Sequence, residues 1–323
     1  MGLHVLTAAV EPTDCIQLLH TYNSMGLQVP TCSVDPTKHR KFAILLSGHA
    51  SEYIRKTYGG VAVLIKNMLS DDGETWDTFH IVDGVFPSDE DLYKYEGFII
   101  TGSFEDSHGS KPWVLRLCEV VRKAYKMKKR LLGICFGHQV ICRALGGRTG
   151  RATHGWELGV KNIQLADAMW LKSYAHQLPS SLNILEAHQD EVFELPPGGE
   201  VLASSKTTCV EIFAMGNQVL GVQGHPEFTE DIAFDILDTY AKKHGIPEGV
   251  VARAKLTLQV SKADSQILRR MCKSFIKATS CQMQTVDFSQ MSIETAYAAR
   301  KGFECYSLDS KLEHELRSAI CRQ

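Results

Sequence analysis

The sequence predicts an α/β fold in which a mostly parallel, doubly wound sheet is flanked by helices. Short, mainly apolar runs at 42–46 and 97–101 are each followed by small residues, as buried parallel strands are. An amphipathic helix is expected over 111–129, where apolar residues recur at spacings of three and four. A strand at 131–134 and a second helix at 136–145 follow directly. Strand and helix therefore alternate, which is typical of a doubly wound sheet.

The other elements are predicted in order along the chain. A helix over 51–68 is interrupted by a turn at Tyr58-Gly59-Gly60, and a weaker strand is expected over 78–82. The second half is richer in β-prone segments, at 160–165, 182–186, 201–204, 210–214 and 219–223. Helices are expected after residue 229, over 230–244, 248–256 and 262–278, with a weak one near 311–322.

The chain divides by composition into one α/β domain between two extensions. A polar, Pro-punctuated stretch closes an N-terminal extension or linker, residues 1–40, and residues 280–323 form a polar, cysteine-containing C-terminal extension. The domain itself is expected over 41–279. We expect any protein partner to bind through the two extensions.

Composition excludes several classes of function. The 323 residues carry 35 basic and 37 acidic side chains, a net charge of −2, so nucleic acid is not the expected partner. No apolar run is long enough to cross a membrane. The ten cysteines form no CxxC pair, and the histidines do not cluster with ligand spacing, so no metal site is predicted. Without a recognisable secretory signal, we expect a soluble protein in the reducing cytoplasm, with free thiols.

The sharpest feature is Gly133-Ile134-Cys135-Phe136-Gly137, a G-x-C-x-G pattern between a predicted strand and a predicted helix. This is the arrangement of a nucleophile elbow with cysteine as the nucleophile. The turn is so tight that the residues two before and two after the nucleophile must lack bulk. Cys135 is then at a helix N-terminus, where partial positive charge favours the thiolate. The N–H of Phe136 points toward a developing oxyanion.

A second pattern supplies a candidate base. Gly224-His225-Pro226-Glu227 follows the last strongly apolar strand. In an extended backbone, residues two apart point the same way, so His225 and Glu227 are expected side by side. Glu227 would then orient the imidazole while its other nitrogen faces Cys135.

The two motifs together resemble those of the class I (triad) glutamine amidotransferase family. The resemblance implies a three-layer, flavodoxin-like fold, with Cys135 as nucleophile, His225 as base and then acid, and Glu227 as orienting carboxylate. It also implies that a second oxyanion donor is the amide of Ser103, or else of Gly102. Gln139 matches the family position that touches the γ-glutamyl group; the alternative is a helix-surface glutamine. His188 and Asp190 are expected to contact the substrate α-amino group or to shape the pocket; the alternative is a capped turn.

Several local stretches are similar to those of plant γ-glutamyl peptidases within this superfamily. They are KTYGG at 56–60, DGE-x-WD at 72–77, KYEGF at 94–98, GICFGHQ at 133–139 and HQDEV at 188–192. The similarity covers about residues 41–278 and implies hydrolysis of the γ-glutamyl amide of glutathione or its S-conjugates. Glutamate would leave by way of a thioester, without a cofactor.

Two other functions stay open. A stand-alone glutaminase would pass ammonia to a partner, because glutamine and glutathione share the same γ-glutamyl group. A non-catalytic, thiol-containing binding protein would keep the fold alone, but the presence of Cys135, His225 and Glu227 argues against it.

Overall fold

The computed structural model describes residues 28–31, 39–175, 178–278 and 282–285. The chain forms two units, one of residues Pro36–Ala278 and one made of Met1–Asp35 with Thr279–Gln323. In the second unit the described residues are two strands, β1 (Gln28–Thr31) and β13 (Gln282–Thr285), which pair antiparallel. The helix predicted near 311–322, and most of both predicted extensions, lie outside the described residues.

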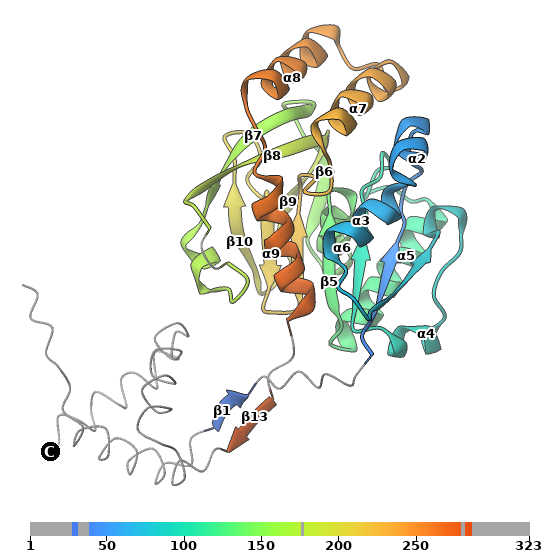
Figure 1. Cartoon of the computed structure of the whole chain (residues 1–323), viewed down its shortest axis with the longest axis vertical. Coiled ribbons are helices and arrows are strands. Elements are labelled where there is room, and N and C mark those ends of the chain that lie inside the picture. Colours follow the sequence, from blue (N-terminus) through green and yellow to red (C-terminus); the bar gives the residue numbers. More distant parts are fainter. Residues whose placement is uncertain (1–27, 32–38, 176–177, 279–281, 286–323) are drawn as a thin grey trace, which may run out of the picture. The chain divides into compact units, whose positions relative to one another are not determined.

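A nine-stranded sheet forms the centre of the larger unit (Figure 1). Five neighbouring strands are parallel: β3 (Thr75–Phe79), β2 (Lys41–Leu45), β4 (Gly97–Ile100), β5 (Arg130–Ile134) and β12 (Val219–Val222). Four antiparallel strands extend the sheet beyond β12: β11 (Ile212–Met215), β10 (Gly199–Ser204), β7 (Glu157–Leu165) and β8 (Ser181–His188). The carboxyl ends of β4, β5 and β12 therefore meet at one edge.

Helices cover both faces of the parallel part, so the predicted three-layer fold is confirmed. Along each strand alternate residues point to opposite faces; on β2, Ile44 packs with α3 (Val61–Leu69) and α9 (Ser265–Lys277), whereas Leu45 packs with the helices opposite. Those helices are α4 (Asp89–Lys94), α5 (Pro112–Lys126) and α6 (Phe136–Ala144).

The remaining helices pack around the antiparallel part and the edge that carries the site. A separate apolar cluster joins β7 and β8 to α2 (Glu52–Tyr58), α7 (Glu230–Lys243) and α8 (Glu248–Val260). Two short 3₁₀ helices, η1 (Ile81–Asp83) and η2 (Asp167–Leu171), complete the described helical elements. The break predicted inside 51–68 separates α2 from α3 at Gly59 and Gly60, both with positive φ. None of the described helices is long and apolar enough to cross a bilayer.

Two details differ from the sequence-based expectation. The strand predicted over 78–82 is wrong by three residues, because β3 pairs in parallel register with β2 from Thr75 onward and Trp76 stacks on Phe42 at 4.8 Å. The chain then turns into η1. A small additional sheet, β6 (Arg148–Arg151) paired with β9 (Asp190–Glu194), was not predicted, because its strands are short and rich in charged residues, so neither shows an apolar pattern.

Candidate active site

Cys135 occupies the turn between β5 and α6, at the carboxyl edge of the parallel strands. Its backbone has φ 52° and ψ −105°, a strained conformation for a residue with a side chain. The turn is held because the Cys135 N–H donates to the carbonyl of Val222 at 2.8 Å, on the neighbouring strand β12. The thiol is largely buried and lies at the N-terminus of α6.

The two glycines of the elbow leave no room for a side chain. A Cβ on Gly137 would lie 2.1 Å from the carbonyl oxygen of Ile100, and a Cβ on Gly133 would lie 2.5 Å from Gly137. Both contacts are with backbone, which cannot move aside. Helix α6 thus starts directly against β4, which brings the β4 end next to Cys135.

His225 and Glu227 lie side by side, with His225 Nδ1 2.9 Å from Glu227 Oε1. The prediction of an extended link between them is wrong: the segment after β12 is a turn, in which Phe228 N–H donates to the carbonyl of His225 at 3.3 Å. The turn also stacks the Phe228 ring on the imidazole, with ring centres 4.1 Å apart. Arg269 of α9 holds the turn from outside, donating to the carbonyl of Pro226 at 2.7 Å.

The charges around His225 favour its protonated form. Burial alone would lower the pKa of His225, but the negative charges of Glu227 and Cys135, together with hydrogen bonds to both side chains, raise it well above its ordinary value. Because Nδ1 faces Glu227, the other ring nitrogen is the one available to Cys135. The arrangement can hold a protonated imidazole beside the Cys135 sulfur.

Backbone amides converge on the same place. The chain leaves β4 at Thr101, and a Cβ on Gly102 would lie 2.9 Å from His225 Cε1 and 3.7 Å from Cys135 Cβ. Within the described residues, no hydrogen-bond acceptor meets the amides of Gly102, Ser103 or Phe136. Free amides beside a cysteine thiol are able to bind a negatively charged oxygen.

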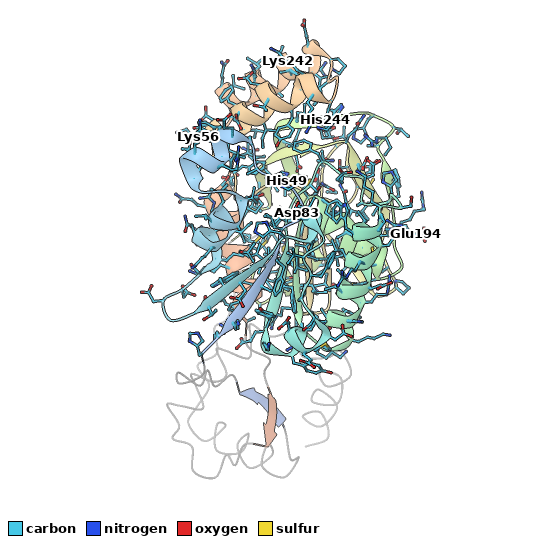
Figure 2. The ribbon with its side chains drawn as sticks, turned by 90° about the vertical axis from the view of Figure 1, so that its right-hand side faces the viewer. His49, Lys56, Asp83, Glu194, Lys242 and His244 are labelled. Carbon is cyan, nitrogen blue, oxygen red and sulfur yellow. The ribbon has the colours of Figure 1, made fainter. Side chains whose placement is uncertain are left out.

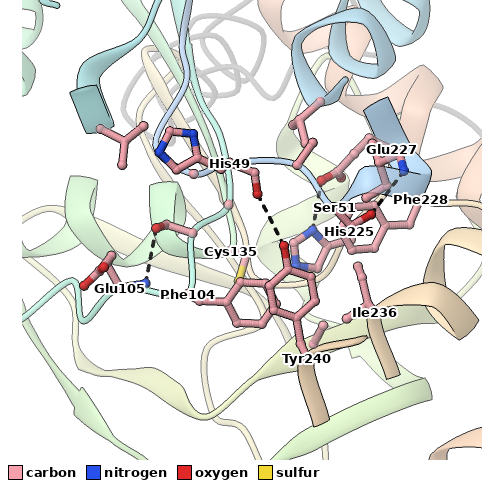
Figure 3. A pocket seen from close by; sticks show the side chains of 18 of the residues that line it. His49, Ser51, Phe104, Glu105, Cys135, His225, Glu227, Phe228, Ile236 and Tyr240 are labelled. Atoms are coloured by element: carbon pink, nitrogen blue, oxygen red, sulfur yellow. Dashed lines mark hydrogen bonds and ion pairs between the residues drawn. The ribbon is translucent and has the colours of Figure 1, made fainter. Parts of the chain in front are cut away.

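A cavity of about 300 Å³ opens over Cys135 (Figure 3). Its inner wall contains five of the predicted site residues, namely Gly102, Ser103, Cys135, His225 and Glu227. Its outer wall comes from the segment before α2, from the loop after β4 and from α7, and includes His49, Ser51, Phe104, Glu105, Tyr240 and Lys243.

The outer wall is aromatic with a few charges. Phe104 stacks on Tyr240 with ring centres 4.0 Å apart, and His244 lies 5.0 Å from Phe104. Figure 2 shows Lys242 and His244 at the end of α7, while His49 lies beside Asp83, with Nε2 3.3 Å from Oδ1. Sequence reasoning missed the α7 residues, because nothing in the pattern of a surface helix indicates which side meets a cavity.

Gln139, His188 and Asp190 are not on the cavity wall. Gln139 is buried, not on the helix surface, and its Nε2 donates to the carbonyl of Asp190 at 2.7 Å and to Oε1 of Gln223 at 3.1 Å. His188 Nδ1 lies 3.0 Å from the same Asp190 carbonyl. These side chains brace α6 against the bend between β8 and β9, behind the cavity.

Acidic and histidine side chains gather in two places among the described residues. In the first, Asp106, His108 and Asp190, the Arg151 guanidinium lies 2.7 Å from Asp106 Oδ1 and 2.8 Å from Asp190 Oδ1, so it already supplies the positive charge. The second, Glu186, His188 and Glu211, is entirely buried and contains no cation side chain.

The fold and the site define an α/β protein with a cysteine at a nucleophile elbow and a His-Glu pair beside it. The family model of glutamine amidotransferase class-I matches residues 65–233. Two Arabidopsis thaliana relatives are similar over most of the chain. Gamma-glutamyl peptidase 5 is 40% identical over 248 residues, 76% of this chain and 99% of the relative. Gamma-glutamyl peptidase 3 is 41% identical over 241 residues, which are 74% of this chain and 97% of the relative.

Solved structures agree on the fold. A glutamine amidotransferase from Thermotoga maritima superposes with a TM-score of 0.58 at 16% identity, over 75% of this chain and 100% of its own. A glutamine amidotransferase from Methylobacillus flagellatus superposes with a TM-score of 0.57 at 12% identity, over 76% of this chain and 97% of its own. The chain belongs to the class-I glutamine amidotransferase family.

Proposed function

We propose that this protein is a cysteine hydrolase that cleaves the γ-glutamyl amide bond of glutathione or a glutathione S-conjugate and releases glutamate. The observation that carries the proposal is the cavity over Cys135. It continues past the nucleophile to an outer wall of aromatic and charged side chains, so it has room for a leaving group larger than ammonia. The names of the relatives at about 40% identity support the same bond class.

In the proposed mechanism, the Cys135 thiolate attacks the γ-carbonyl carbon. The amides of Phe136 and Ser103, or Gly102, stabilise the oxyanion. His225, held by Glu227, gives its proton to the leaving nitrogen, so the C–N bond breaks and a γ-glutamyl thioester remains. His225 then takes a proton from water, which attacks the thioester and releases glutamate and the thiolate.

The outer wall supplies candidates for substrate recognition. Lys243 has no carboxylate partner among the described residues, and its ammonium lies 5.7 Å from the centre of the Tyr240 ring. It is our candidate for the carboxylate at the far end of the leaving peptide. Phe104 and Tyr240 offer apolar surface for an S-substituent. The Glu105 carboxylate is the candidate for the glutamyl α-ammonium group, although Lys111 now lies 2.5 Å from it.

A glutaminase that supplies ammonia to a partner is the second candidate, because the inner site is the same for both substrates. The extensions would be the binding region for such a partner. The free thiols of the described cysteines agree with a reducing, cytoplasmic setting, which remains part of the proposal.

The test is release of free glutamate by the purified full chain, with glutathione, an S-conjugate and glutamine each as sole substrate. We expect release from glutathione or the conjugate, with a higher kcat/KM than from glutamine. Release from glutamine alone would favour the glutaminase. If the folded protein releases glutamate from none of the three substrates, the remaining hypothesis is a non-catalytic binding protein.

A further inference from the structure

Three buried side chains form a group behind the nucleophile, outside the cavity. Glu186 and His188 lie two residues apart on β8, and Glu211 directly precedes β11. Their exposed fractions are 4%, 4% and 1%, and one oxygen or nitrogen atom from each side chain lies within 4.8 Å of the corresponding atoms of the other two. The group borders the segment that carries His225, because a Cβ on Gly224 would lie 2.8 Å from Glu186 Oε1.

As ionised groups, the two carboxylates would be without adequate partners. Within the described residues, no donor meets either oxygen of Glu186 or Oε2 of Glu211 in hydrogen-bond geometry. An uncompensated buried charge costs several kcal/mol, and two adjacent carboxylates also repel each other. At least one of the two therefore has to carry a proton.

The tautomer of His188 indicates where that proton lies. Nδ1 faces the carbonyl oxygen of Asp190 at 3.0 Å, and because a carbonyl only accepts, Nδ1 carries the ring hydrogen. Burial lowers the pKa of His188 to about 4, so the ring is neutral at pH 7 and Nε2 is an acceptor. Nε2 lies 3.4 Å from Oε2 of Glu186. Two acceptors face each other there unless Glu186 is a neutral acid.

We propose that Glu186 is a positioning residue: a neutral carboxylic acid whose single hydrogen is shared between the Glu211 carboxylate and Nε2 of His188, and whose neutrality keeps negative charge away from the Cys135 thiolate. The proposal rests on the proposed function in that Cys135 is the nucleophile. Burial, followed by the charges of Glu211 and Cys135, raises the pKa of Glu186 well above its usual value. Burial also raises the pKa of Glu211, to about 7, while hydrogen bonds from Ser205 and Glu186 oppose the rise.

The other charges near the group are already accounted for. Glu157 of β7 pairs with Lys161 at 2.5 Å and lies 3.5 Å from His154 Nε2. Burial raises the pKa of Glu191 on β9. The catalytic side presents Cys135 and His225. Because electrostatic repulsion is reciprocal, a thiolate that disfavours ionised Glu186 would itself be disfavoured by it.

The experiment replaces Glu186 by its neutral isostere and measures Cys135 without any substrate. The rate of Cys135 alkylation by iodoacetamide is followed from pH 5 to 10, with the Cys135 peptide quantified by mass spectrometry. In Glu186→Gln the pH midpoint should stay within about 0.3 units of the wild type. If Glu186 is ionised in the wild type, removal of its charge would lower the midpoint by about one unit, a tenfold change in the thiolate equilibrium, and would overturn the proposal.

One control variant and two further measurements complete the test. Glu105→Gln removes a carboxylate from the cavity side, and it should shift the midpoint to lower pH, which shows that the assay detects a nearby charge. Should Glu186→Gln fail to fold, carbon-13 NMR of the glutamate carboxyl groups in the wild-type chain decides. A neutral-acid resonance at pH 7 is expected, and its absence would overturn the proposal. One divalent metal ion per chain that the wild type binds and Glu186→Gln does not would overturn it too, because a cation at this group would replace the proton.

Because alkylation needs no substrate, this result is independent of which γ-glutamyl compound is cleaved. A midpoint that stays unchanged in a protein inactive on all γ-glutamyl substrates would support Glu186 as a neutral acid while rejecting the proposed function.

Discussion

Nδ1 of His225 lies 2.9 Å from Oε1 of Glu227, which leaves the opposite ring nitrogen for Cys135. Glu227→Gln keeps the shape of this contact and removes the charge that raises the pKa of His225. We expect kcat to fall by roughly 10²- to 10⁴-fold. The limb of the kcat–pH profile that belongs to His225 should move to lower pH. Glu230→Gln, an exposed carboxylate at the start of α7, is the control and should leave both unchanged. An unshifted profile in Glu227→Gln would contradict the orienting role.

The thiol of Cys135 should be indispensable, whereas that of Cys142 should not. Cys135→Ala should lower kcat by roughly 10⁴-fold or more, with the melting temperature retained. Cys142 lies two turns further along α6, buried, with its pKa raised to about 12 by burial, so it is an inert thiol. Cys142→Ala should keep activity at a small cost in stability. Glutamate release that survives in Cys135→Ala would show a different nucleophile.

The elbow glycine should control stability. In Gly137→Ala the new Cβ would lie 2.1 Å from the Ile100 carbonyl oxygen, so β4 and α6 would have to separate. We expect a loss of about 3 kcal/mol or more in the free energy of unfolding, measured by urea titration. Gly249→Ala on α8 is the matched control, because no atom lies within 4 Å of its added Cβ. That change should stabilise by at most about 1 kcal/mol. Equal effects of the two substitutions would contradict the packing argument.

Lys243 should distinguish substrates by their leaving group. Lys243→Met removes the charge near the cavity and keeps the aliphatic stem. KM for glutathione should rise by about tenfold, equivalent to about 1.4 kcal/mol, while KM for glutamine stays the same because ammonia has no carboxylate. Lys242→Met, next to it on α7, should change neither (Figure 2). A similar rise for both substrates would assign Lys243 to the glutamyl half instead.

His138 should make the fold sensitive to acid. Burial lowers its pKa to about 3, against about 6.5 in an unfolded chain. Between these two pH values the unfolded chain binds more protons than the folded chain. The free energy of unfolding therefore decreases as the pH is lowered below 6.5, by up to about 1.4 kcal/mol per pH unit. Glu186 and Glu211 act in the opposite direction, since their raised pKa values favour the folded state as pH falls toward 4.5.

The role of His138 is therefore measured as the difference in free energy of unfolding between the wild type and His138→Gln. Urea titrations at pH 7, 6 and 5 should show that the wild type loses more of this free energy than the variant as the pH falls. A gap independent of pH would show that His138 is not neutral and buried.

The fold was largely predictable because its signals are local. Apolar runs such as 97–101 and the helix at 111–129 show their burial in their own periodicity. The strand at 78–82 was misplaced because β3 is an edge strand whose half-buried side chains give no such signal, and only its register with β2 fixes it. The small sheet of β6 and β9 was not predicted because its short strands are rich in charged residues and show no apolar pattern.

The sequence by itself determined the residue pattern of the candidate site: a glycine two residues to each side of Cys135, and His225 and Glu227 two residues apart. Short-range sterics impose these patterns, so they are visible in a string of letters. The tertiary structure decided which distant segments meet them. In the folded chain, Gln139, His188 and Asp190 lie behind the cavity, whereas Tyr240 and Lys243 lie on its wall. Glu186 is buried next to Glu211. These contacts depend on strand order and helix packing across long stretches of chain, which no local pattern records.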